Sequence, residues 1–198
     1  MTIRRRADAD LPALVGILEA QRPTSGYPVR WPLPFPAEEF IARRTELAAW
    51  VAVEPGRDGA VVGHVSLTGV ATGWDADGWG AGTGLPASAL AAVSVLFVDP
   101  LATGRGVGGT LLATAVDHAR GIGRTPVLDV VSESRRAVAL YTRHGWQVVG
   151  RARPPWLPAE REPLLLMALP SSAPLSSAPL CDPLDPAVTQ GERPGRRR

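Results

Sequence analysis

Two apolar runs with almost no polar alternation constrain the fold of this chain more than any other feature. They are "ALAAVSVLFV" at 89–98 and "PVLDVV" at 126–131. Strands with this pattern are typical of sheets that helices cover on both faces. A segment with helical spacing follows each run, at 108–123 and 132–145. The two runs therefore predict buried central strands of an α/β domain.

Shorter patterns complete a single domain over residues 1–169. A strand and a helix are predicted within 2–22, with Asp10 as the helix N-cap, and a second helix at 37–47. Further strands are predicted at 49–54, 60–70, 146–152 and 163–169. The glycine-rich segment 71–88 is predicted to be a long loop. This order of elements indicates a mixed sheet of about six to seven strands with about four helices.

Residues 170–198 differ in composition from the domain. They contain "SSAPL" twice and then a basic end, and such Pro/Ser-rich sequence is predicted to be disordered. The single cysteine, Cys181, lies here without a possible internal disulfide partner. There is also no evident signal peptide or membrane span, so we expect a cytoplasmic protein with no membrane partner.

Charge and missing residue types exclude several functions. The net charge of +2 and the lack of a clustered basic face do not favour nucleic-acid binding. The chain has no lysine, which excludes a P-loop nucleotide site and a lysine Schiff base. No cluster of His, Asp, Glu or Cys has metal-ligand spacing, so no metal is predicted.

Four glycines between residues 104 and 109 allow two interpretations. Gly104, Gly106 and Gly109 match the dinucleotide fingerprint G-x-G-x-x-G, and Asp129 stands near the position of its ribose-binding acid. That match would predict a nicotinamide-dependent oxidoreductase. In that fold, however, the first glycine directly follows the strand. Here five residues separate Val98 from Gly104, which weakens this interpretation.

A second interpretation uses more of the sequence. The segment "LFVDPLATGRGVGGTLL" resembles the acetyl-CoA-binding segment of the GNAT superfamily of N-acetyltransferases, a strand ending in V-x-P and then [Q/R]-x-x-G-x-[G/A]. The segment "LDVVSESRRAVALYTRHGWQVVG" is similar to the next block of that family. The resemblance implies a GNAT-like domain splayed between its fourth and fifth strands. It also implies acetyl-CoA as co-substrate.

Physical chemistry supports a phosphate-binding loop at this point. A helix N-terminus offers unpaired N–H groups and a partial positive charge, and glycine lets the backbone approach a diphosphate closely. The resemblance implies these cofactor-binding residues: Leu96, Phe97, Val98, Thr103, Gly104, Arg105, Gly106, Val107, Gly108, Gly109 and Ser134. Thr103 and Ser134 depart from the family's usual Gln or Arg and its usual Asn.

Two residues are candidates for catalysis. The resemblance implies that Tyr141 protonates the departing CoA thiolate, as a phenol that stays protonated at neutral pH can. Ala92 stands where many relatives have a glutamate base. His64, on the adjacent strand, could accept the ammonium proton, although a half-buried structural histidine fits the pattern equally well.

Aromatic residues in the predicted loops are candidates for binding the acceptor. They could form an apolar pocket wall or pack beneath the loops, and both interpretations stay open. They are Tyr27, Trp31, Phe35, Trp74, Trp79 and Trp156. The predicted function is direct acetyl transfer to the amine of a small molecule or peptide, with a homodimer as the candidate assembly. The alternative is a non-catalytic acyl-CoA sensor on the same fold.

Overall fold

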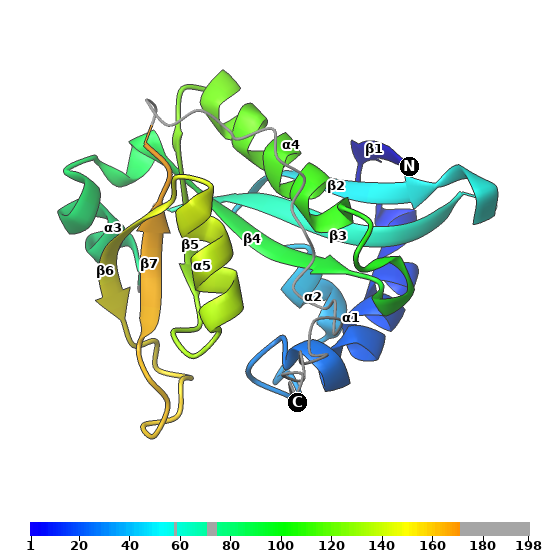
Figure 1. The fold of residues 1–198 in the computed structure, drawn as a ribbon, viewed down its shortest axis with the longest axis horizontal. Coiled ribbons are helices and arrows are strands. Elements are labelled where there is room, and N and C mark those ends of the chain that lie inside the picture. Colours follow the sequence, from blue (N-terminus) through cyan, green and yellow to red (C-terminus); the bar gives the residue numbers. More distant parts are fainter. Residues whose placement is uncertain (58, 71–74, 171–198) are drawn as a thin grey trace, which may run out of the picture.

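Seven strands form one sheet in the order β1-β2-β3-β4-β5-β7-β6 (Figure 1). The computed structural model describes residues 1–57, 59–70 and 75–170. The strands are β1 (Thr2–Arg5), β2 (Glu46–Glu54), β3 (Ala60–Gly69), β4 (Leu90–Val98), β5 (Thr125–Val130), β6 (Gln147–Ala152) and β7 (Leu164–Ala168). Only β4 and β5 pair in parallel among the described strands, and the other neighbours are antiparallel. The predicted mixed α/β fold is confirmed.

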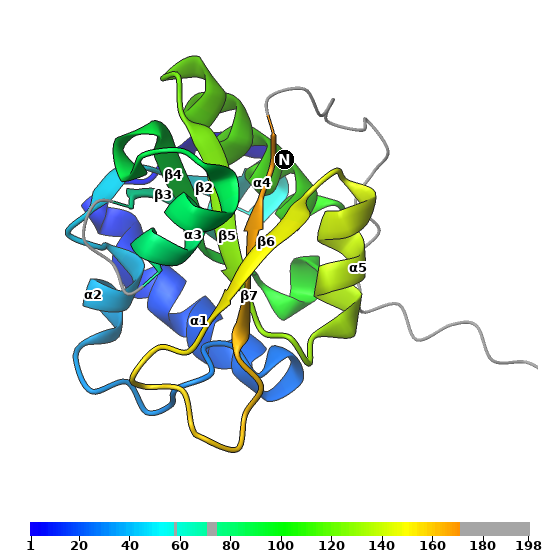
Figure 2. The same ribbon diagram turned by 90° about the vertical axis from the view of Figure 1, so that its left-hand side faces the viewer.

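Helices cover both faces of the sheet. They are α1 (Leu11–Ser25), α2 (Ala37–Ile41), α3 (Ala76–Thr83), α4 (Val107–Gly121) and α5 (Arg135–Arg143). The buried face of α4 packs on one side of the sheet, and Val138 and Tyr141 of α5 pack against the same cluster. Helices α1, α2 and α3 cover the other side. Figure 2 shows α3 and α5 on opposite sides of β6 and β7.

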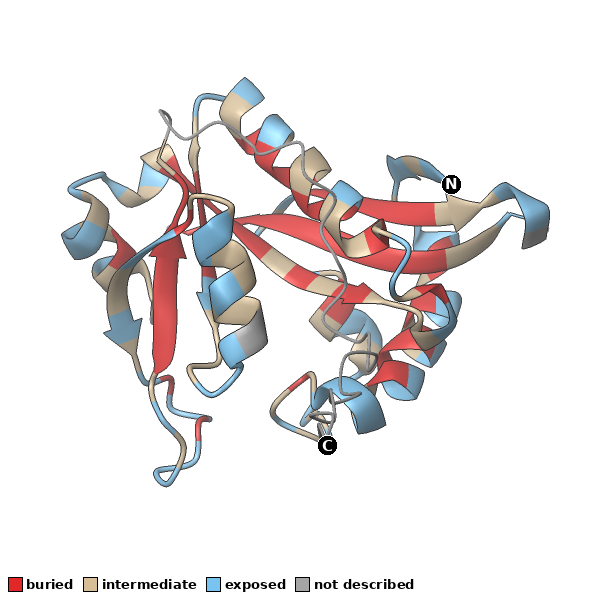
Figure 3. Cartoon of the chain, in the orientation of Figure 1, coloured by how far each residue is buried: buried red, intermediate tan, exposed pale blue. Residues whose placement is uncertain are grey.

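The core follows the pattern expected for a sheet between two helical layers. In Figure 3 buried residues run along the central strands, while the outer faces of the helices are exposed. Leu14 and Leu18 of α1 and Leu111 of α4 are completely buried. Burying an aliphatic side chain of this kind contributes about 1.5–3 kcal/mol to stability.

The parallel pair β4–β5 is short. The two strands pair at only three positions, from Leu90 with Thr125 to Ala92 with Val127. Beyond these pairs β4 diverges from β5 (Figure 1), so the β5-facing edge of its last residues has no partner strand among the described residues. The predicted opening between the fourth and fifth strands is present.

A bulge changes the course of β4 inside this opening. The β3–β4 register shifts between His64 and Ser66, and Val95 has a positive φ of 52°. A positive φ is rare for a β-branched residue and costs free energy that the surrounding contacts must supply. Before the bulge, the even positions Leu90 and Ala92 face the layer of α1, α2 and α3. After the bulge, the odd positions Val95 and Phe97 face this same layer.

The second predicted helix is shorter than expected. It ends at Ile41, and β2 already begins at Glu46. Arg6 explains this end, since its guanidinium donates to the Ile41 carbonyl at 3.2 Å and to Glu46 at 3.0 Å. A carbonyl at the end of a helix needs such a partner.

The predicted loop at 71–88 contains helix α3, so the prediction of a structureless segment there is wrong. Three glycines make this helix weak by intrinsic propensity. Burial of Trp79, which is 1% exposed, stabilises it. Gly82 lets the helix lie directly against β6, because a Cβ at this position would stand 2.0 Å from the Val149 carbonyl oxygen. Residues 71–74, with Trp74, and residues 171–198, with Cys181, lie outside the described residues.

Candidate functional site

The opening between β4 and β5 leads into a large cavity. Its volume is about 1540 Å³, and residues of both strands, of α5 and of the N-terminus of α4 line it. A pocket that binds a single drug-sized ligand usually measures about 300–1,000 Å³. The cavity therefore has room for a long cofactor together with a second, smaller molecule.

Most of the predicted cofactor-binding residues line this cavity. They are Leu96, Phe97, Val98, Thr103, Gly106, Gly108, Gly109 and Ser134. The first three lie on β4 after its last pair with β5, the glycines begin α4, and Ser134 precedes α5. The fold thus brings the two sequence blocks to one place.

The start of α4 has the geometry of an anion site. Gly104 and Gly106 both have φ +75°, a conformation that glycine adopts without strain. Gly106 is the N-cap, and no side chain of the described residues caps the first N–H groups of the helix. The first N–H groups of α4 are therefore available to a ligand in the cavity, where the helix dipole favours a negative charge.

Gly104, Arg105 and Val107 do not line the cavity, and Thr103 lines it with its hydroxyl already bonded. Arg105 forms an ion pair with Glu54 at the end of β2, away from the cavity. Val107 is a core residue, 3% exposed, so it can offer a ligand only its main chain. The Thr103 hydroxyl donates to the Pro100 carbonyl at 2.7 Å, which leaves it an acceptor rather than a donor toward phosphate.

Tyr141 of α5 lines the cavity together with Asp129 of β5. Its ring packs at 5.8 Å between centroids against the buried Trp146. Burial, and then the charge of Asp129, raises the pKa of the Tyr141 hydroxyl to about 12. The hydroxyl is therefore protonated at any physiological pH and can act as a proton donor.

Asp129 is the functional candidate that sequence reasoning missed. Leu128 points into the core from one face of β5, and Asp129 lies on the other face. Asp129 is an exposed residue that lines the cavity. The surrounding walls limit its hydration, and this burial, followed by the charge of Asp75, raises its pKa to about 6. A carboxyl group with this pKa can both accept and release a proton near neutrality. The sequence signal was a lone aspartate in an otherwise apolar strand, a position where a charged side chain is rare.

The structure does not place His64 in the cavity. It is completely buried between β2 and β4, and its ring lies against Phe97. Burial lowers its pKa to about 4, so it is neutral at pH 7. Its Nδ1 lies 2.9 Å from the Val95 carbonyl oxygen, and because that oxygen can only accept, Nδ1 carries the proton. His64 supports the β4 bulge instead of meeting a substrate.

A comparison with family models decides the family. The model of the Acetyltransferase (GNAT) family matches residues 14–146, about two thirds of the chain. The chain belongs to the GNAT acetyltransferase family. The match includes both β4 and β5, the glycine loop and Tyr141. As a GNAT protein it is an acyltransferase of a family that uses acetyl-CoA.

Solved GNAT structures share this fold. The ribosomal-protein-S18-alanine N-acetyltransferase from Escherichia coli superposes with a TM-score of 0.61 at 20% identity, over 89% of this chain and 97% of that one. A GCN5-related N-acetyltransferase from Kribbella flavida gives 0.60 at 24% identity, over 85% and 96%. NAA60 from Arabidopsis thaliana, in complex with acetyl-CoA, gives 0.61 at 18% identity, over 84% and 97%. At these identities the likeness shows the fold.

A comparison with curated protein sequences gave no significant match. Within the part of this GNAT chain that the structure describes, no helix has the length and apolar character needed to cross a membrane.

Proposed function

We propose that the protein transfers the acetyl group of acetyl-CoA directly to the primary amine of a small molecule or peptide. The observation that carries this proposal is the cavity itself. It joins the free edge of β4, the open N-terminus of α4, and the Asp129–Tyr141 pair. Membership of the GNAT family supports acetyl-CoA as the acetyl donor, and the arrangement of these groups supports direct transfer to an amine.

The described residues fit the cofactor along its length. The N–H groups at Gly106, Gly108 and Gly109 would bind the diphosphate, and the unpaired edge of Leu96–Val98 would bind the pantetheine amides. We leave Arg105 out of this site because its guanidinium pairs with Glu54. The phosphate contacts are then mainly backbone contacts.

The proton steps follow from the two raised pKa values. We assign the base role to Asp129 in place of His64, because Asp129 faces the cavity and is largely ionised at pH 7. It takes a proton from the acceptor ammonium. The amine nitrogen then bonds to the thioester carbonyl carbon and the carbon–sulfur bond breaks. Tyr141 gives its proton to the departing sulfur, and the second proton that the nitrogen loses as the amide forms restores the Tyr141 hydroxyl.

The test of this function is amine-dependent release of free CoA. The purified chain is incubated with acetyl-CoA and a panel of amines, and thiol and acetylated product are measured together. We expect both to form in equal amounts with at least one amine. Acetyl-CoA binding without turnover on any amine would contradict transferase activity and favour the alternative of an acyl-CoA sensor.

Replacing Tyr141 by phenylalanine should lower kcat by about 100-fold, the lower end of the usual contribution of general acid catalysis, since the acid is lost while the ring is kept. The contact with Trp146 involves only the ring, so the fold should not change. The Kd of acetyl-CoA should stay within about twofold, because binding rests on backbone groups elsewhere. Steady-state rates and a binding titration measure both quantities. Unchanged kcat would remove Tyr141 from this role.

A further inference from the structure

One end of the cavity presents charges of both signs. Arg43, from the segment after α2, lines it together with Asp75, just before α3, and Asp129 on β5. The charge of Arg43 lowers the pKa of both carboxyl groups, in opposition to the burial that raises them. Arg43 thus lies within electrostatic reach of both carboxylates. Neither carboxylate forms an ion pair with it within the described residues.

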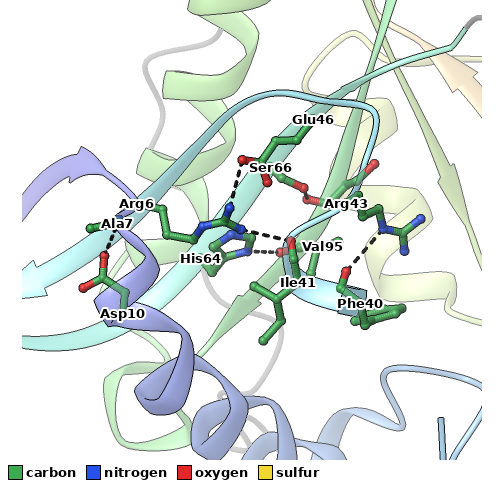
Figure 4. A network of polar contacts seen from close by, with 11 residues as sticks. Arg6, Ala7, Asp10, Phe40, Ile41, Arg43, Glu46, His64, Ser66 and Val95 are labelled. Atoms are coloured by element: carbon green, nitrogen blue, oxygen red, sulfur yellow. Dashed lines mark hydrogen bonds and ion pairs between the residues drawn. The ribbon is translucent and has the colours of Figure 1, made fainter. Parts of the chain in front are cut away.

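Within the described residues, the guanidinium of Arg43 contacts only Phe40. Its Nε donates to the Phe40 carbonyl at 3.4 Å, and its central carbon lies 4.9 Å from the centre of the Phe40 ring (Figure 4). Its two terminal nitrogens have no hydrogen-bond partner within the described residues. In contrast, the terminal nitrogens of Arg6 are bound by Glu46 and the Ile41 carbonyl. Arg43 therefore presents a free planar fork at the cavity wall, and such a fork matches a carboxylate.

Further charges of both signs line the cavity, with Glu39 and Glu133 among them. Arg30 and Arg44 line the cavity together with Arg43. An acceptor with one ammonium and one anionic group would meet an opposite charge at each position.

We propose that the acceptor is a free α-amino acid whose carboxylate binds Arg43 while its ammonium group faces Asp129. This rests on the proposed function and names its substrate class. The amino acid nitrogen forms a bond to the acetyl carbon, and the thioester carbon–sulfur bond breaks. The nitrogen loses two protons: the first passes from the ammonium to Asp129, and the second replaces the proton that Tyr141 gives to sulfur. The carboxylate of the amino acid stays ionised throughout.

The test compares matched acceptors on the purified full chain. The standard amino acids, their α-amides and the corresponding decarboxylated amines are assayed for acetyl-CoA-dependent CoA release. The preferred amino acid should exceed its amide in kcat/KM by at least about tenfold, since only the acid can form the charge-assisted pair. Arg43→Gln should abolish this preference by raising KM for the acid about tenfold or more, with kcat/KM for the amide within about twofold.

Arg143→Gln provides the control. Arg143 lies on the exposed side of α5 outside the cavity, and this change removes the same charge. It should leave the acid-over-amide preference unchanged. Equal or faster acetylation of amides or plain amines would overturn this inference, and so would a preference for the acid that survives Arg43→Gln. Either result would leave the proposed acetylation of amines intact. If no amine releases CoA, the proposed function fails, and this inference fails with it.

Discussion

Replacing Asp129 by asparagine is expected to lower kcat/KM for amine acetylation by about 10²–10⁴-fold, the usual contribution of a general base. Asparagine has nearly the same shape but cannot accept the ammonium proton. Initial rates of CoA release measure the effect. Asp117→Asn, at an exposed position of α4 outside the cavity, removes the same charge and should stay within about twofold of the wild-type rate.

The pH profile gives this prediction a second readout. Burial raises the pKa of Asp129 to about 6, so the carboxyl group is protonated below that pH and cannot act as a base. The wild-type kcat/KM should therefore rise with pH through a midpoint near 6, provided that the acceptor does not titrate there. This limb should vanish in Asp129→Asn. A variant that keeps both the rate and the limb would show that another group is the base.

The same pKa shift predicts how stability depends on pH. The usual pKa of 3.8 is raised in the folded state, so the folded state holds its proton more tightly than the unfolded state. The stability that this provides is present at low pH and is lost as pH rises toward 6. The Tm of Asp129→Asn minus the Tm of the wild type should therefore increase as the pH rises from about 4 to about 7. A loss of Tm would indicate that the low activity comes from misfolding.

The second large effect is expected on stability. Gly82→Ala should destabilise the fold by more than about 3 kcal/mol, because overpacking against backbone cannot be relieved by a side-chain rotation. The new methyl group would lie 2.0 Å from the carbonyl oxygen and 2.7 Å from the carbonyl carbon of Val149 on β6. Helix α3 would have to leave the sheet, which would expose Trp79. Urea unfolding of the variant and the wild type gives the difference.

Gly80→Ala is the matched control on the same helix. A Cβ at this position would stand 3.5 Å from the nearest atom, the Leu85 carbonyl oxygen, which is ordinary contact. This change should be neutral or stabilising by up to about 1 kcal/mol, because alanine favours a helix over glycine. Equal stability of the two variants would contradict the close packing of α3 on β6.

The central sheet and the glycine loop beside the cavity could be predicted from the sequence because their signals are local. Uninterrupted apolar runs identify β4 and β5, and amphipathic spacing identifies α4 and α5. The glycines at 104 and 106 are explained by positive φ angles. The dinucleotide interpretation loses its geometric basis, since the 3₁₀ helix Pro100–Ala102 stands between β4 and the first glycine.

The acceptor side could not be predicted because it depends on contacts between distant segments. Asp129, Asp75 and Arg43 meet only when β5, α3 and the segment after α2 come together. The position of Arg105 depends on Glu54, fifty-one residues away. His64 could not be distinguished from a cavity residue, because the pleat of β3 and the bulge of β4 decide which way it points. Helix α3 follows from packing that overrides glycine's low propensity.

Calorimetric titration with acetyl-CoA tests the central claim most directly, because every proposed step requires the donor to bind in the opening between β4 and β5. The account predicts saturable binding of one acetyl-CoA per chain with a Kd of about 1–100 µM, in the range where enzymes usually bind substrates. It also predicts that Asp129→Asn and Tyr141→Phe keep this affinity while losing turnover. The absence of binding at acetyl-CoA concentrations of about 500 µM, well above that range, would contradict it.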